Sequence, residues 1–280
     1  MKYLKLAMLP WLIWSWPAHA TLDLAALETP GWQEFVRGDF YAALSKGRAA
    51  NTANGYALAC RSGLTLGGFL EKEEAAIRLL HEAVADCQKA LQKEPGHYFA
   101  KMSLSIALSF EGKRLKRVAY AKQAKAHIEE LITAEPGNAL GYGALAAWHT
   151  EVSAAGFWAR MILGARRKLA KRYFEKALEM GAMDFPLQFE YVKFLARGNK
   201  AARAKALKAA DKLMRQSSPL AIDKIILQKC TELRAILQAG RKKAILKAVN
   251  DASAFKDVEK MAHLKALPLE SSPQSISSSQ

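Results

Sequence analysis

The chain has 280 residues, with 42 Lys and Arg against 26 Asp and Glu, which gives a formal net charge of +16. Hydrophobic residues make up 51% of the chain, enough for a sizeable core, and this excludes a disordered or collagen-like protein. Alanine occurs 51 times and valine only seven times, which argues against a β-rich fold. We therefore expect an all-α protein.

Residues 1–20 are typical of a secretory signal peptide. Two lysines precede an apolar stretch from Leu6 to Trp16, and Ala18 and Ala20 supply the small residues that signal peptidase requires. The apolar stretch is shorter than the roughly 20 residues of a membrane span. We expect cleavage after Ala20 and a periplasmic or secreted protein that is soluble after cleavage. A buried N-terminal helix is the alternative.

Helical periodicity fills the chain from residue 33 onward, and the prolines between Gly31 and Leu267 fall between the periodic segments. The predicted helices are 33–50, 54–69, 73–94, 97–111, 114–134, 138–155, 158–180, 186–197, 199–216, 219–238, 240–250 and 252–265. The end of the chain, residues 267–280, is rich in serine and poor in apolar residues, so we expect a disordered tail there.

One short pattern occurs twice. ALQKEPG at 90–96 recurs as LITAEPG at 131–137, and a degenerate form, ALEMG, follows at 177–181. Recurrence at intervals of this kind is typical of a helical repeat array. In such arrays alanine lets two helix backbones approach closely, while one large side chain per helix fills the remaining gap.

The chain resembles the tetratricopeptide repeat (TPR) family at these positions. The residues that match its signature are Ala83, Cys87, Ala90 and Pro95 in one unit, Ala170, Phe174 and Ala177 in another, and Tyr142, Leu145, Ala146 and His149 in a first helix. The resemblance implies a right-handed superhelical array of five to six helix hairpins over residues 21–266, with lengthened or inserted segments. It also implies that the concave surface binds a protein or an extended peptide, and that the protein is not an enzyme.

The spacing departs from the TPR unit of about 34 residues, because Pro95 and Pro136 are 41 residues apart. In its lengthened helix pairs the chain is similar to the T component of TRAP-type transporters and to the regulator-of-microtubule-dynamics family. The first similarity implies an alternative function, an accessory ligand-handling subunit of a transport system. A closed apolar cavity beside Trp158 would favour that function, and an exposed insertion would favour protein binding.

The segment from Thr150 to Lys168 is the most distinctive insertion. One interpretation is an apolar lip with arginines that pair with anions; the other is a lengthened helix whose apolar side packs on the next hairpin. From the first interpretation we predict a partner surface made of Trp148, Phe157, Trp158, Arg160, Met161, Arg166 and Arg167.

Two basic stretches, 113–125 and 193–215, suit an anionic envelope surface or polymer as partner. A tether to the envelope through this basic face is therefore a further alternative function. The simpler interpretation is a solvated face that keeps the array soluble. Nucleic acid is not expected, because no aromatic residues are interleaved with the charges and an exported protein rarely meets it.

The chain has three cysteines, and Cys60 and Cys87 fall on consecutive predicted helices. A disulfide between them is one option in an oxidising compartment. Counted from a turn near 70–72, however, the two positions are out of register, which favours buried free thiols. No motif predicts a catalytic, cofactor-binding or metal site, and His149 is expected to fill an aromatic position in the array.

Overall fold

The computed structural model describes residues 28–181 and 184–268, and within these residues it is all-helical, without a strand. The α-helices are α2 (Trp32–Arg37), α3 (Phe40–Ala50), α4 (Ala53–Thr65), α5 (Glu73–Lys93), α6 (Tyr98–Leu115), α7 (Val118–Ala134), α8 (Ala139–Ala154), α9 (Phe157–Leu163), α10 (Arg167–Glu179), α11 (Phe185–Ala196), α12 (Lys200–Met214), α13 (Ala221–Ala239) and α14 (Lys242–Asp251). A π-helical segment, η1 (Leu66–Leu70), and a 3-10 helix, η2 (Val258–Met261), complete the described elements. The all-α prediction is confirmed.

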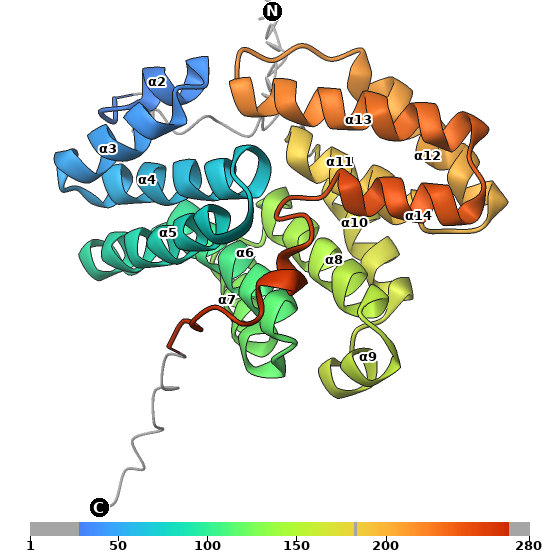
Figure 1. Cartoon of the computed structure of the whole chain (residues 1–280), viewed down its shortest axis with the longest axis horizontal. Helices are drawn as coiled ribbons and strands as arrows, with labels where there is room; N and C mark the ends of the chain where they lie inside the picture. Colours follow the sequence, from blue (N-terminus) through green and yellow to red (C-terminus); the bar gives the residue numbers. More distant parts are fainter. Residues whose placement is uncertain (1–27, 182–183, 269–280) are drawn as a thin grey trace, which may run out of the picture.

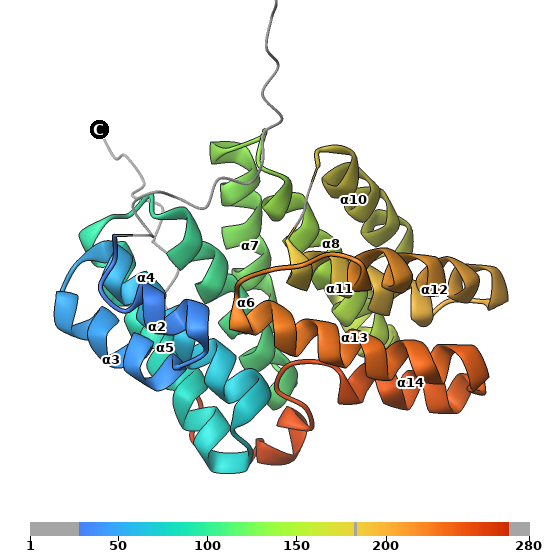
Figure 2. The ribbon, with the colours of Figure 1, turned by 90° about the horizontal axis from the view of Figure 1, so that it is seen from above.

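Consecutive helices pack against one another in pairs that follow the chain (Figure 1). The pairs are α4 with α5, α6 with α7, α8 with α10, α11 with α12, and α13 with α14. The row of pairs bends until its ends meet, because α13 contacts α2 and Ile222 packs in one cluster with Trp32 and Phe35. The view from above shows the start of α13 next to α2, with α14 lying along α13 (Figure 2).

Two predicted helices are each divided by a glycine. The helix expected at 33–50 ends at Gly38, whose φ of 96° lies in the left-handed region, and Asp39 then caps α3 by accepting from the Ala42 N–H. The helix expected at 158–180 is divided at Gly164, with φ 65°, into α9 and α10. The insertion is therefore a separate short helix and not a lengthened one.

The alanines of the repeat signature lie where helices touch. Ala83 and Ala90 on α5 and Ala170 and Ala177 on α10 are fully buried, and so is the large side chain of Phe174 between the last two. Small residues at these positions allow the close backbone approach that helix pairs of this kind need.

The C-terminal segment crosses back to the first half of the molecule (Figure 1). We call residues 252–268 the C-terminal strap. The Phe255 N–H donates to the Gly68 carbonyl at 2.9 Å, and the Phe255 ring lies 4.7 Å from that of Phe110. The helix predicted at 252–265 is wrong, because left-handed residues at 255 and 257 bend the strap onto α5 and α6.

The predicted signal peptide, residues 1–20, and residues 269–280 of the predicted tail lie outside the described residues. Leu267, placed in that tail, is instead held by hydrogen bonds to α6 and α7. None of the described helices combines the length and apolar character that a membrane crossing requires.

Candidate functional site: a central cavity and its margin

The bent row of helices surrounds a cavity of about 1530 Å³ that is partly open to solvent. Its walls come chiefly from α4, α6, α8, α11 and α13, and the strap lines one side. Apolar side chains on the wall include Leu58, Phe99, Met102, Ile106, Phe110, Leu140, Trp148, Phe185, Phe189, Ile222 and Phe255. Ile106, at the middle of α6, remains 41% exposed, so the cavity presents a free apolar surface to whatever enters.

Two ion pairs lie on the α8–α11 side of the cavity. Arg197 contacts Glu151 at 2.6 Å, and the buried Lys193 contacts Glu190 at 2.5 Å. Burial by itself would raise the pKa of Glu151, but the cations of Arg197 and Lys193 hold this pKa below its ordinary value. This wall is therefore charged and internally paired.

Two further carboxylates line the cavity near the place where the two ends of the helix row meet. Asp184 caps α11 by accepting from the Leu187 N–H, and Asp223 accepts a hydrogen bond from the Ser218 hydroxyl at 2.5 Å. Burial raises the pKa of both carboxyl groups. Both serve as local hydrogen-bond acceptors that fix the starts of α11 and α13.

A buried ion pair on α6 holds the C-terminal strap. Glu111 and Arg114 are fully buried, and their side chains meet at 2.6 and 2.8 Å. The Arg114 guanidinium also donates to the carbonyl oxygens of Met261 (2.6 Å), Leu264 (3.1 Å) and Lys265 (3.0 Å). Three main-chain carbonyls of an irregular segment are thus satisfied by one side chain.

The partners of Glu111 complete this arrangement, which we call the strap clamp (Glu111, Arg114 and Tyr120). Glu111 accepts from the Leu267 N–H at 3.1 Å, and Tyr120 donates to the Leu267 carbonyl. Burial opposes ionisation of Glu111, but Arg114, His81 and the Leu267 N–H lower its pKa to about 2. The helices therefore bind an irregular peptide segment through its main-chain groups.

The predicted partner surface divides into two parts. Trp148 is buried, lines the cavity and donates from Nε1 to the Ala121 carbonyl at 2.9 Å. Phe157, Trp158 and Met161 lie on α9, which buries none of its residues. They are 59%, 69% and 55% exposed. The packed-helix interpretation of this insertion is therefore wrong, and the structure supports an exposed apolar lip.

The three arginines of the predicted surface differ in their surroundings. Arg160 lies on α9 with its guanidinium 5.7 Å from the Phe157 ring centre. Arg166 precedes α10, and its main-chain N–H donates to Nδ1 of His149 at 3.4 Å. Arg167 turns away to the Phe194 carbonyl at 2.9 Å, with its guanidinium over the Phe194 ring. Only Arg160 and Arg166 remain beside the lip.

His149 is buried against Tyr173, with ring centres 5.8 Å apart and an interplanar angle of 8°. Burial lowers the pKa of His149 to about 4, and the nearby Lys125 adds to this effect. The imidazole is neutral at pH 7 and fills an aromatic position in the helix contact.

The two basic stretches are only partly free. Arg114 is buried in the strap clamp, and Lys193 and Arg197 are paired on the cavity wall. The exposed cations of the second stretch lie along α12. A uniform basic face across both stretches is therefore not present.

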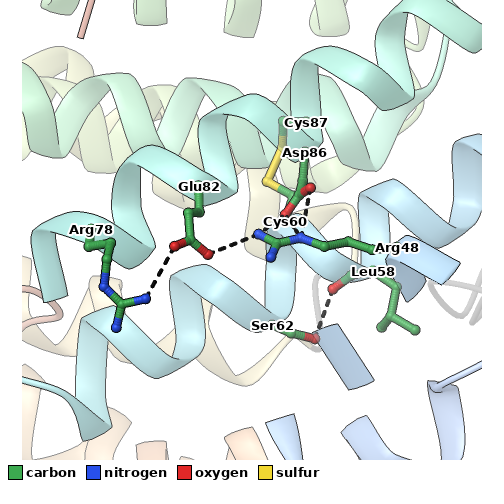
Figure 3. A network of polar contacts seen from close by, with 8 residues as sticks. All are labelled: Arg48, Leu58, Cys60, Ser62, Arg78, Glu82, Asp86 and Cys87. Atoms are coloured by element: carbon green, nitrogen blue, oxygen red, sulfur yellow. Dashed lines mark hydrogen bonds and ion pairs between the residues drawn. A yellow bond between two sulfur atoms is a disulfide. The ribbon is translucent and has the colours of Figure 1, made fainter. Parts of the chain in front are cut away.

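Cys60 on α4 and Cys87 on α5 form a disulfide, with their Cα atoms 5.3 Å apart (Figure 3). The register count that favoured free thiols is therefore wrong, because the packing of α4 against α5 places the two cysteines opposite each other. Beside the disulfide, Arg48 binds both oxygens of Asp86 at 2.7–3.0 Å and Glu82 at 3.1 Å. The disulfide thus links α4 to α5, and the ion pairs of Arg48 link α3 to α5.

The strap clamp and the cavity wall were not identified from the sequence. The only local signal was the pair Glu111 and Arg114, three residues apart next to a basic stretch, and this spacing also suits an ordinary surface ion pair. Within the described residues there is no group of His, Cys, Asp and Glu that could hold a metal ion.

Comparison with protein-family models, with curated proteins and with solved structures finds no match for this chain.

Proposed function

We propose that this chain is an exported, non-enzymatic interaction module, built as a right-handed superhelical array of TPR-like hairpins, whose central cavity holds an extended segment of a partner protein. The strap clamp carries the proposal, because there the helices already bind an irregular segment by its main-chain carbonyls and N–H groups. Recognition through main-chain groups suits extended peptides of varied sequence.

The shape and chemistry of the cavity support the same function. Helices α4 and α11 line it while their pairing partners α5 and α12 contribute nothing to its wall, and such an alternation is typical of helical repeat arrays. Helices α6 and α8 supply much of the rest of the wall, with smaller contributions from α7 and α10. The wall combines free apolar surface at Ile106 with polar groups on α8 and α11. Such a surface binds through many distributed contacts.

The alternative, an accessory ligand-handling subunit of a transport system, is less well supported. It calls for a closed apolar cavity beside Trp158, but this side chain is 69% exposed and lies outside the lining of the central cavity. The disulfide between Cys60 and Cys87 is consistent with export in either case.

Selection from a library of extended peptides displayed on phage, followed by fluorescence anisotropy with the selected peptide, tests the proposal. Ile106→Asp places a charge on the cavity wall at an exposed position, and we expect at least about tenfold weaker binding. Ile236→Asp is the matched control, since Ile236 is 39% exposed on α13 and does not line the cavity. Equal binding by both variants, or failure to select any peptide, would refute the proposal.

A further inference from the structure

Helix α9 lies at the margin of the molecule (Figure 1), and we call its exposed apolar side chains the lip. Phe157, Trp158, Met161 and Ile162 are each more than half exposed, within a helix of seven residues. Apolar groups gathered in this way mark an interaction site more often than scattered single residues do.

The lip stands clear of the helices around it. Gly156 and Gly164 bound α9 with φ values of 121° and 65°, and at either glycine a Cβ atom would meet nothing within 4 Å. Leu163 is the side chain of α9 that packs against the core cluster. The apolar side chains of the lip are therefore open to solvent, while Leu163 on the same helix packs inward.

Cations surround the lip without acids among them. From Gly156 to Arg172 the chain carries Arg160, Arg166, Arg167, Lys168, Lys171 and Arg172 and no Asp or Glu. Arg160, Arg166 and Lys168 form no ion pair within the described residues, and only Lys171 in this segment has an acidic partner, Glu175 at 3.6 Å. The segment that carries the lip is therefore strongly basic.

Arg160 and Arg166 also line a hollow of about 300 Å³ between α9 and the start of α10, together with Phe157 and Met161. Two guanidinium groups beside an open hollow can pair with a phosphate group. Apolar and cationic side chains thus lie side by side around this hollow.

We propose that α9 docks this protein on the surface of an anionic membrane. Phe157, Trp158, Met161 and Ile162 enter the boundary between headgroups and acyl chains, and Arg160 and Arg166 pair with lipid phosphates in the hollow. An exposed apolar helix with flanking cations and an exposed tryptophan suits a fluid interface, which needs no matching pocket. Arg160 also lines the central cavity, but Phe157, Trp158, Met161 and Ile162 do not, so the variants at Trp158 and Met161 test membrane docking separately from peptide binding in the cavity.

Vesicle binding tests the proposal, using protein purified from the periplasm after expression with its own leader. Flotation with vesicles of phosphatidylcholine and about 30% phosphatidylglycerol is compared with phosphatidylcholine alone. We expect binding to the anionic vesicles, at least tenfold weaker in Trp158→Ser/Met161→Ser and in Arg160→Ser/Arg166→Ser.

Matched control variants distinguish binding through the lip from nonspecific binding through any exposed apolar or cationic residue. Ile236→Ser removes an exposed apolar side chain elsewhere, and Lys242→Ser/Lys243→Ser removes two exposed cations from α14. Both should bind anionic vesicles as the parent protein does, and so should Ile106→Asp.

Tryptophan fluorescence gives a second readout. The other described tryptophans, Trp32 and Trp148, are buried, so quenching by brominated lipids reports mainly on Trp158. Failure of the parent protein to bind anionic vesicles, or equal binding by the lip variants and their controls, would overturn the proposal.

Discussion

The Arg114 guanidinium lies 2.6 Å from the Met261 carbonyl oxygen, joining α6 to a segment 147 residues further along the chain. The same guanidinium is paired with the buried carboxylate of Glu111. The contact ties the end of the helix row to its first half, and together with the meeting of α13 and α2 it holds the bent shape of the row around the cavity. Stability and cavity shape therefore depend on the same buried ion pair.

Arg114→Ala should destabilise the fold strongly. The substitution leaves the Glu111 carboxylate buried without its main partner and removes donors from three carbonyls, which together cost about 3–5 kcal/mol in the free energy of unfolding. Urea denaturation measures this loss. The double variant Glu111→Gln/Arg114→Met, which removes both charges, should lose less than Arg114→Ala. A loss below about 1 kcal/mol for Arg114→Ala would contradict this assignment.

His149 should make stability depend on pH below 6.5. Its folded-state pKa, about 4, lies below its ordinary value of 6.5, so between these values the unfolded chain binds the proton more tightly. The stability is fully present above pH 6.5 and is lost as the pH falls toward 4, by about 1–2 kcal/mol at pH 5. His149→Phe, which keeps the stacking on Tyr173, should show a flatter profile. Parallel profiles for the two proteins from pH 7 to 5 would contradict the burial of a neutral imidazole.

The disulfide should be visible in a thiol count and in stability. The denatured, unreduced protein should release one free thiol, Cys230, and three after reduction. Cys60→Ala/Cys87→Ala should lower the free energy of unfolding by about 2–4 kcal/mol, given the 27-residue separation. Burial raises the pKa of Cys230 to about 11, so maleimide should not label the native protein at pH 7. Three free thiols before reduction would show that the bridge is absent.

Gly47→Ala should be destabilising through a direct helix contact. A Cβ atom at Gly47 on α3 would lie 2.6 Å from the Gly55 carbonyl oxygen on α4, so the helices must separate, at a cost of about 1–3 kcal/mol. Gly137→Ala is the control, because nothing lies within 4 Å of a Cβ atom there. Thermal unfolding compares them, and equal midpoints would show that α3 and α4 do not approach so closely.

Local sequence rules predicted the helices and their contact positions well. Alanines of the repeat signature, such as Ala83 and Ala170, are buried because small residues at this spacing allow two helices to pack closely. The errors arise where tertiary contacts override helical periodicity. The strap at 252–268 has helical composition, but Arg114 and Gly68 offer its main chain other partners.

The candidate site was harder to predict than the fold. The apolar residues of α9 have helical spacing, which does not distinguish a packed face from an exposed one. Only the three-dimensional structure shows that the glycines at 156 and 164 separate α9 from its neighbours and leave it exposed. The cavity wall draws single residues from helices far apart in sequence, so no local motif marks it. The pairing of Cys60 with Cys87 is a contact between α4 and α5 that counting residues from the turn did not reproduce.

Site-specific photocrosslinking in cells tests the occupancy of the cavity most directly. A benzophenone side chain replaces Ile106 on the cavity wall in one protein and Ile236 outside the cavity in another. We predict a discrete protein adduct from position 106 and none from position 236. No adduct at position 106, or the same adducts from both positions, would contradict the proposal that the cavity holds a segment of a partner protein.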